Sequence, residues 1–260
     1  MDKATLGGLV LALGGIFLGL LIEGGNLGQV LQPTAALIVF GGTLGAILIQ
    51  YPLPVVIAGF RRLAHVFVEP AQNAQNTVAT LVQYAKQARR EGLVSLDKET
   101  SKIEDPFLRR ALMLAIDGAE SQELRQIMEL ELHNKEEQEE KIPQVFDSAG
   151  GFSPTIGIIG AVLGLIQVMQ HLDHMDEVGR GIAVAFVATI YGVGAANLFF
   201  LPAAGKLRIR IREEQIIREM TLEGVISILE GMNPRTLQTK LVGFLSQAQE
   251  PAAAAEDRSS

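Results

Sequence analysis

The stretch AVAFVATIYGVGAANLFFLPAAG, residues 183–205, contains no charged side chain. An apolar helix of roughly 20 residues is long enough to cross the hydrocarbon core of a bilayer. The same length and composition recur elsewhere, and they predict four membrane-spanning helices: Ala4–Ile22, Thr34–Tyr51, Ser148–Gln170 and Gly181–Ala203. We therefore expect an all-α, polytopic membrane protein with a helical cytoplasmic domain.

Composition supports a membrane protein and argues against several other classes. Hydrophobic residues make up 48% of the 260 residues, and no charged residue occurs from Gly24 to Phe60. The chain has no cysteine, which excludes a disulfide framework and a thiolate metal site. The net charge of −7 argues against nucleic acid as a main partner. The first span is longer than a usual signal-peptide core and lacks a clear cleavage site, so we expect it to be retained.

Basic residues predict the orientation of the spans. The two short connections contain a single basic residue, Arg180, whereas Arg61 and Arg62 follow the second span. Lys206 and Arg208 open a basic run after the fourth span. By the positive-inside rule, the long loop, the tail and both termini are cytoplasmic. The expected domains are spans 1–54, a cytoplasmic loop domain 55–147, spans 148–205, cytoplasmic helices 206–248 and a disordered tail 249–260.

The cytoplasmic part carries helical patterns with recognisable start and stop signals. An Asp-Pro or Asn-Pro pair is typical of an N-cap followed by proline in the first turn. The expected helices are one over 77–86 ending near Gly92, one opened by Asp105-Pro106, one from Ser121 to near Pro143, one continuing the fourth span to Gly231, and a last one capped by Asn233-Pro234.

The interior of the spans contains polar side chains but no carboxylate, amine, guanidinium or imidazole group. No Asp, Glu, Lys, Arg or His lies in the middle of any predicted span. Intramembrane ionisable groups usually mark ion pathways, so the chain either moves no ions or receives a carboxylate from another subunit. A lone hydroxyl in a helix often bonds only to the carbonyl four residues earlier, which is the alternative to a functional role. The polar residues are Thr43, Thr155, Gln167, Thr189, Tyr191 and Asn197.

Two prolines and several glycines indicate where the spans bend and where they pack closely. Pro154 lies early in the third span and Pro202 late in the fourth, and each favours a kink because it removes a helical N–H. Ala161 lies ~10 Å beyond Pro154 and Thr189 ~20 Å before Pro202, near the bilayer midplane. Glycine pairs at a spacing of four predict close helix packing, either within one chain or between chains. These pairs are Gly15 and Gly19, Gly41 and Gly45, and Gly160 and Gly164.

An ordered set of segments resembles a known family. The segments are FSPTIGIIGAVLGLIQVM (152–169), VAFVATIYG and FFLP in the fourth span, ARREGLVSLDKE (88–99) and EGMNPRTLQTKL (230–241). Together they resemble the A subunit of the flagellar motor stator, the MotA/PomA family within the MotA/TolQ/ExbB superfamily. The resemblance implies a role in motility and chemotaxis, an inner-membrane location and a homopentameric ring of A subunits. It also implies a MotB/PomB-like B-subunit dimer that supplies a membrane aspartate, and the rotor protein FliG as the driven partner.

The resemblance assigns roles to individual residues. Pro154 and Pro202 match the prolines that couple ion flow to movement, and Thr189 matches the threonine that faces the B-subunit aspartate. The rotor contact is expected at Arg89, with Asp97 where the family often has glutamate. The neighbouring residues Arg90, Lys98 and Glu99 add charge to the same stretch.

Two alanines bear on the coupling ion. Sodium-driven relatives have a hydroxyl at the position of Ala161, and Ala188 beside the threonine also lacks one. A dehydrated sodium ion requires oxygen ligands, whereas a proton requires only an acceptor and a hydrogen-bonded route. We therefore favour protons over sodium, with a sodium-driven stator as the alternative.

Other functions remain as alternatives. An ExbB/TolQ-like proton-driven energiser of an envelope protein typically has three spans, so four spans argue against it. A membrane scaffold without ion flux explains the glycines but not the proline pair with Thr189. We see no nucleophile–base pattern of an enzyme and expect no cofactor. A metal site is conceivable in the loop HLDHMDE, at His171, Asp173, His174, Asp176 and Glu177, although an exposed polar turn explains this loop equally well.

Overall fold

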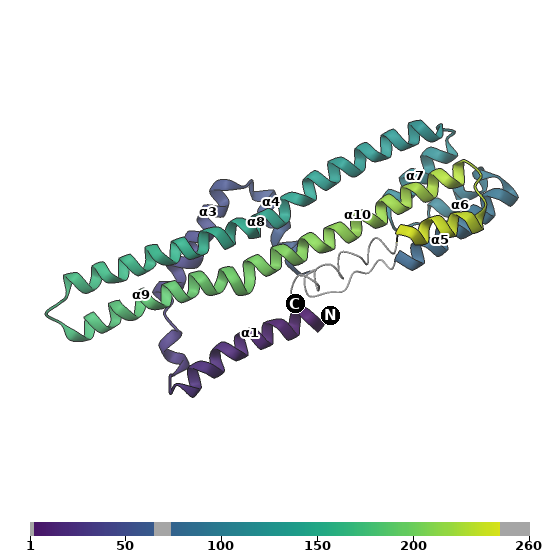
Figure 1. Cartoon of the computed structure of the whole chain (residues 1–260). Helices are drawn as coiled ribbons and strands as arrows, with labels where there is room; N and C mark the ends of the chain where they lie inside the picture. Colours follow the sequence, from purple (N-terminus) through teal and green to yellow (C-terminus); the bar gives the residue numbers. More distant parts are fainter. Residues whose placement is uncertain (1–2, 65–73, 245–260) are drawn as a thin grey trace. The chain divides into compact units, whose positions relative to one another are not determined.

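The computed structural model describes residues 3–64 and 74–244 (Figure 1). All regular structure in these ranges is helical, and no strand occurs in them, which confirms the all-α prediction. Four helices are long and apolar enough to cross a membrane, as predicted. The expected disordered tail, residues 249–260, lies outside the described residues.

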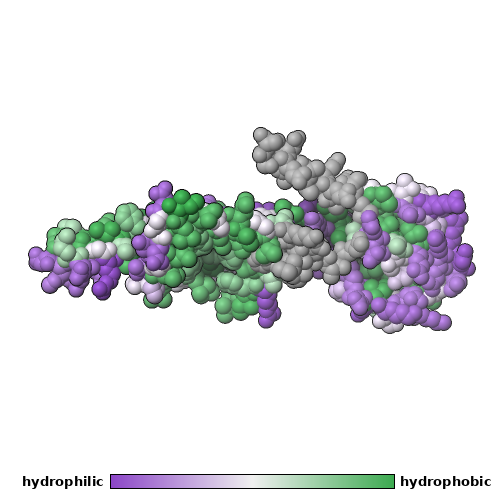
Figure 2. Space-filling view, turned by 90° about the horizontal axis from the view of Figure 1, so that it is seen from below, coloured by the Kyte–Doolittle hydropathy of each residue, from purple (hydrophilic) through white to green (hydrophobic). Residues whose placement is uncertain are grey.

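The described residues form two compact units. One lies within Met1–Glu69 and Glu140–Arg208 and contains the spans, and we call it the spanning unit. The other lies within Pro70–Glu139 and Ile209–Ser260, and we call it the polar unit. In Figure 2, apolar side chains gather over the spanning unit, and mainly polar side chains cover the polar unit.

Each predicted span has a counterpart in the spanning unit. The first is α1 (Lys3–Ile22), which is followed by the short 3₁₀ helix η1 (Leu27–Val30). The second span is built from consecutive helical segments, which are α2 (Pro33–Ala36), the π-helix η2 (Leu37–Gly41) and α3 (Gly42–Gln50). A short helix, α4 (Leu53–Leu63), follows.

The third and fourth spans form a hairpin. The third is the C-terminal part of α8 (Ser121–Gln170). The fourth consists of α9 (Met175–Ala195), the π-helix η5 (Ala196–Phe200) and the first residues of α10 (Leu201–Leu229). Figure 1 shows α8 and α9 side by side on either side of the turn that joins them.

The prediction that a helix ends near Pro143 is wrong. Helix α8 continues through Pro143 and Pro154 without a break. An interior proline costs about 3 kcal/mol because it removes a backbone hydrogen bond. Here the neighbouring residues Ile142 and Phe146 are buried against Ala204 and Leu207, so packing offsets that cost.

Pro202 lies where the backbone is already irregular. The N–H of Leu201 donates to the carbonyl of Ala196, five residues earlier, which defines the π-turn of η5. Pro202 follows directly, within the first turn of α10. Such π-turns often occur at functional positions, and this one coincides with the proline that the sequence singled out.

The polar unit is a helical bundle around one apolar core. It contains α5 (Ala74–Glu91), η4 (Leu93–Leu96), α6 (Asp97–Thr100), α7 (Pro106–Ile116), the first part of α8, the last part of α10 and helical backbone over residues 234–244. Leu81, Leu96, Leu112, Leu124 and Met220 are among its fully buried side chains.

The predicted helix ends in the polar unit are confirmed. Helix α5 ends before Gly92, whose φ of +83° favours glycine. A carboxylate oxygen of Asp105 accepts a hydrogen bond from the N–H of Phe107 at 3.0 Å, which caps α7. Asn233 caps the last described helix in the same way, through the N–H of Arg235 at 3.0 Å.

Candidate functional site

The close contact between α8 and α9 defines the centre of the spanning unit. A Cβ atom at Gly192 would lie 2.6 Å from the carbonyl oxygen of Ser153 and 3.2 Å from Cα of Pro154. A Cβ atom at Gly157 would lie 2.9 Å from the carbonyl oxygen of Ala188 and 3.5 Å from Cα of Thr189. Only glycine allows backbones to approach so closely. We call this contact the glycine seam, and it brings Pro154 and Thr189 onto one interface.

The glycine pairs predicted from the sequence separate into two groups. At Gly160 and Gly164 a Cβ atom would meet Ala188 and Gly181 at 2.8 Å, so this pair packs within the chain. Around Gly15, Gly19, Gly41 and Gly45 no described atom would lie within 4 Å of such a Cβ atom. Packing within the chain is therefore confirmed for Gly160 and Gly164, and packing between chains stays a prediction for the other two pairs.

Thr189 is half-buried on α9. Its hydroxyl donates to the carbonyl of Ala185 at 3.2 Å, and Thr43 and Asn197 likewise bond to carbonyls four residues earlier, at 2.6 Å and 2.9 Å. The local bond that the sequence left as an alternative is thus present. A hydroxyl that donates one bond still has lone pairs that accept. Thr189 can therefore receive a hydrogen bond from a protonated carboxyl group while it stays in this rotamer.

The two alanines differ in their surroundings. Ala188 is fully buried, and it packs in a cluster with Ala35 and Val39 of the second span. Ala161 lies one helical turn beyond Gly157 on α8 and is half-buried. A hydroxyl at Ala161 would therefore have more access to a partner or an ion than one at Ala188.

Pro202 lies away from the glycine seam. It lines a pocket of about 430 Å³ with residues of α1, among them Gly8 and Ala12, and with Asn197 and Lys206. Its ring is exposed within this chain. The structure therefore places the two prolines in different surroundings, Pro154 half-buried at the glycine seam and Pro202 at the surface of the chain.

Sequence reasoning gave no role to Tyr191 and did not single out Ser153, two polar residues beside the seam. Tyr191 donates its hydroxyl to the carbonyl of Val30 at 2.6 Å and accepts the N–H of Gln32 at 3.3 Å, so it ties α9 to the start of the second span. Ser153 is fully buried, and its hydroxyl has no hydrogen-bond partner among the described residues. Their only signal was a polar residue inside an apolar segment.

The loop that was considered for metal binding forms an ordinary turn. His171 contacts Glu177 at 3.4 Å and the carbonyl of Gln167 at 3.0 Å. Among residues 3–64 and 74–244, no group of three or more His, Asp or Glu side chains converges in a way that could hold a metal ion.

The predicted rotor-contact residues lie close together in the chain around Gly92. Arg89 and Arg90 are exposed in the last turn of α5, and Asp97 and Lys98 are exposed at the start of α6. Their neighbour Glu99 is half-buried and forms an ion pair with Lys102 at 3.2 Å.

Two further features mark this surface. Arg89 lines a cavity of about 230 Å³ with Leu93 of η4 and with Ile228 and Met232. Burial, with the negative charge of Glu99 as a second cause, raises the pKa of Tyr84 above its usual value.

Comparison with known proteins places the chain in a family. Residues 6–92 match the model of the motility protein A N-terminal region, and residues 99–220 match that of the MotA/TolQ/ExbB proton channel family. Motility protein A of Bacillus subtilis is 34% identical over 250 residues, covering 94% of this chain and 91% of that protein.

Solved structures agree with these matches. The structure of C. jejuni MotAB aligns with a TM-score of 0.88 at 33% identity, covering 94% of this chain and 96% of the matched one. The flagellar MotAB stator complex from Bacillus subtilis aligns with a TM-score of 0.86 at 33% identity, covering 97% of this chain and 100% of the matched one. The chain therefore belongs to the motility protein A family of flagellar motor stator subunits, within the MotA/TolQ/ExbB proton channel family.

Proposed function

We propose that five copies of this chain form a ring around a dimer of B subunits in the bacterial inner membrane, with both termini in the cytoplasm. Ion flow through the complex turns the ring, and the ring drives the rotor protein FliG. One observation carries the proposal: the spans have no Asp, Glu, Lys, Arg or His at their centre, although the chain matches MotAB complexes over nearly its whole length. The carboxylate that an ion pathway requires then comes from the B subunit.

Thr189 is the proposed partner of that carboxylate. In the neutral state, the carboxyl O–H donates to the threonine oxygen, which is free to accept because its own hydrogen is bonded to Ala185. In the charged state, the aspartate lacks that donor and carries a desolvation cost in a low-dielectric site. The two states then favour different positions of the ring, and ion entry and exit bias its rotation.

Protons are the proposed coupling ion. Ala161, which is half-buried on α8, supplies no oxygen ligand, and this leaves a sodium ion poorly coordinated. Ala188 says less about the coupling ion, because its side chain is buried by this chain's own packing. The role needs no enzymatic chemistry and no resident cofactor.

The rotor contact is proposed at the surface around Gly92. Exposed Arg89, Arg90, Asp97 and Lys98 present both signs of charge within a short stretch. Mixed charge of this kind suits recognition of a partner that carries complementary charges. Glu99 belongs to the same surface, but its carboxylate already forms an ion pair with Lys102.

Swimming speed tests the proposal and the ion together. The chain is expressed with its own B subunit in a stator-deleted host, and speed is measured across sodium concentrations at fixed pH. We expect speed to be independent of sodium and to collapse with a protonophore. A rise with sodium overturns the ion assignment but keeps the stator, whereas absence of swimming in all conditions contradicts the stator role.

A matched pair of variants tests the role of Thr189. Thr189→Val and Thr43→Val each remove a hydroxyl that bonds to the carbonyl four residues earlier, and both keep the side-chain shape. Thr43 is 1% exposed and is closed to any partner. We expect Thr189→Val to abolish swimming while Thr43→Val keeps most of it. Equal losses mean that the hydroxyl of Thr189 has only a structural role.

A further inference from the structure

Helix α4 starts at the end of a membrane span. Helix α3 ends at Gln50 and α4 begins at Leu53, so the connection reaches at most ~10 Å. The junction is fixed, because the hydroxyl of Tyr51 contacts the carbonyl of Gln144 at 3.0 Å and the hydroxyl of Ser148 at 2.8 Å. Helix α4 must therefore lie at the membrane surface, whatever the orientation of the chain.

One face of α4 is attached to the spanning unit. Val56 is 3% exposed and is buried with Val145, and a Cβ atom at Gly59 would lie 3.5 Å from the ring of Phe146. The rings of Phe60 and Phe146 meet edge to face with centroids 6.1 Å apart. These contacts hold α4 on α8 and fix which residues its other face presents.

The other face of α4 is apolar and uncovered. Leu53 is 59% exposed and Ile57 is 44% exposed. An amphipathic helix at a membrane surface buries such residues among the acyl chains and keeps its basic residues at the headgroups. Arg61 and Arg62, in the last turn of α4, are placed for that role.

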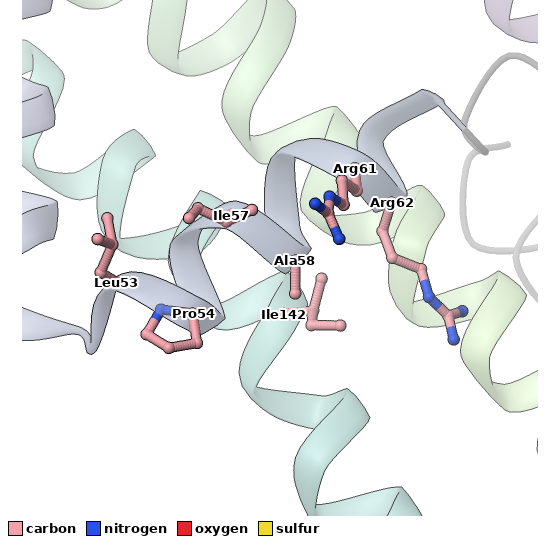
Figure 3. A pocket seen from close by; sticks show the side chains of 7 residues that line it. All are labelled: Leu53, Pro54, Ile57, Ala58, Arg61, Arg62 and Ile142. Carbon is pink, nitrogen blue, oxygen red and sulfur yellow. The ribbon is translucent and has the colours of Figure 1, made fainter.

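A pocket joins the apolar face to the arginines. It has a volume of about 580 Å³, and Figure 3 shows Arg61 and Arg62 at the end of α4 beyond its apolar lining. None of its lining residues is acidic, and they are Leu53, Pro54, Ile57, Ala58, Arg61, Arg62 and Ile142. The guanidinium of Arg61 is exposed and has no hydrogen bond or ion pair with any described residue, whereas Arg62 is half-buried and has an interaction of its own. The carboxylate of Asp147, on the same helix as Ile142, pairs with Arg208.

We propose that this pocket binds an anionic phospholipid. The phosphate lies on Arg61 and Arg62, and an acyl chain runs along Leu53 and Ile57. The pocket suits both the headgroup and the acyl chain of such a lipid. Arginine binds phosphate through several donors, and the apolar lining adjoins a membrane span. A soluble anion would leave that floor in water. The site is separate from the proposed ion pathway and does not depend on ion flux.

A tryptophan reporter tests the site directly. The chain contains no tryptophan, so Ile57→Trp introduces a single fluorophore in the pocket. The full chain is reconstituted in phosphatidylcholine vesicles, and brominated phosphatidylglycerol or brominated phosphatidylcholine is added as quencher. We expect phosphatidylglycerol to quench at about thirtyfold lower mole fraction, the size expected for two arginines near a phosphate. Adding Arg61→Gln and Arg62→Gln should remove this preference.

Two controls separate the pocket from general lipid contact. Ile49→Trp places the fluorophore on α3 at a residue that is 91% exposed and outside the pocket, where we expect equal quenching by both lipids. Arg208→Gln removes a cation of the same unit that pairs with Asp147, and the preference at position 57 should persist. Equal quenching by both lipids at position 57 overturns the proposal, and so does a preference that survives the double arginine variant. Absence of quenching by either lipid overturns it as well, because a protein then covers the pocket.

Discussion

The two units of this chain achieve close packing by opposite means. In the spanning unit, α8 and α9 meet through Gly157 and Gly192, with backbone against backbone. In the polar unit, large side chains such as Leu81 and Leu112 fill the core, and ion pairs surround it. The difference follows from the solvent. Lipid offers no hydrophobic gain for burying a leucine, so helices in a membrane gain most from close contact, whereas water rewards the burial of large apolar groups.

The comparison predicts that the polar unit loses most when a large side chain is shortened. Leu112→Ala removes a fully buried side chain from the core and should cost about 2–5 kcal/mol. Leu130→Ala is the matched control, because Leu130 is 62% exposed in the same unit. Limited proteolysis and thermal unfolding of the full chain should show early loss of the polar unit only for Leu112→Ala. Equal behaviour of both variants would mean that this core is not close-packed.

The opposite change should damage the spanning unit. Gly192→Val adds a side chain where the nearest atom is the carbonyl oxygen of Ser153, which cannot move without shifting α8. Overpacking of this kind costs about 1–3 kcal/mol, and we expect swimming to be lost. Gly15→Val meets open space within the chain and should leave the unfolding of the isolated subunit unchanged. If both variants unfold alike, the seam is not what holds the hairpin together.

The fold could be predicted from the sequence where local rules are strong. Length and hydropathy identified the four spans, and the caps at Asp105 and Asn233 follow from chemistry within two residues. The predicted helix end at Pro143 was wrong because packing between distant residues, and not a local rule, decides the structure there. A local rule cannot include the packing of Ile142 and Phe146 on Ala204, which lies far along the chain and keeps α8 continuous.

The site could be predicted only in part. The sequence indicated Thr189 and Pro154, and the structure places both on the glycine seam. It could not distinguish Gly164, which packs on α9, from Gly15, which meets open space, because both have a glycine four residues away. It also gave no role to Tyr191, whose partner Val30 is 161 residues away in the chain. The roles of these residues depend on contacts between segments that are distant in the chain, which the sequence does not show.

The smallest predicted effect concerns an ion pair of the polar unit and depends on pH. Burial alone would raise the pKa of Glu223, but hydrogen bonds from Arg125 and Lys240 outweigh it, so the pKa lies below its usual value of 4.5. A carboxylate with a lowered pKa stabilises the fold above its unfolded pKa, and that contribution disappears as the pH falls through the folded pKa. Glu223→Gln should therefore lower the thermal midpoint at neutral pH, and the difference from the unmodified chain should shrink below about pH 4.5. Glu104→Gln, at an exposed glutamate of the same unit, should leave the thermal midpoint at neutral pH unchanged. The difference in thermal midpoint between Glu223→Gln and the unmodified chain could instead stay constant down to about pH 3. That result would show that the shape of Glu223, and not its charge, stabilises the fold.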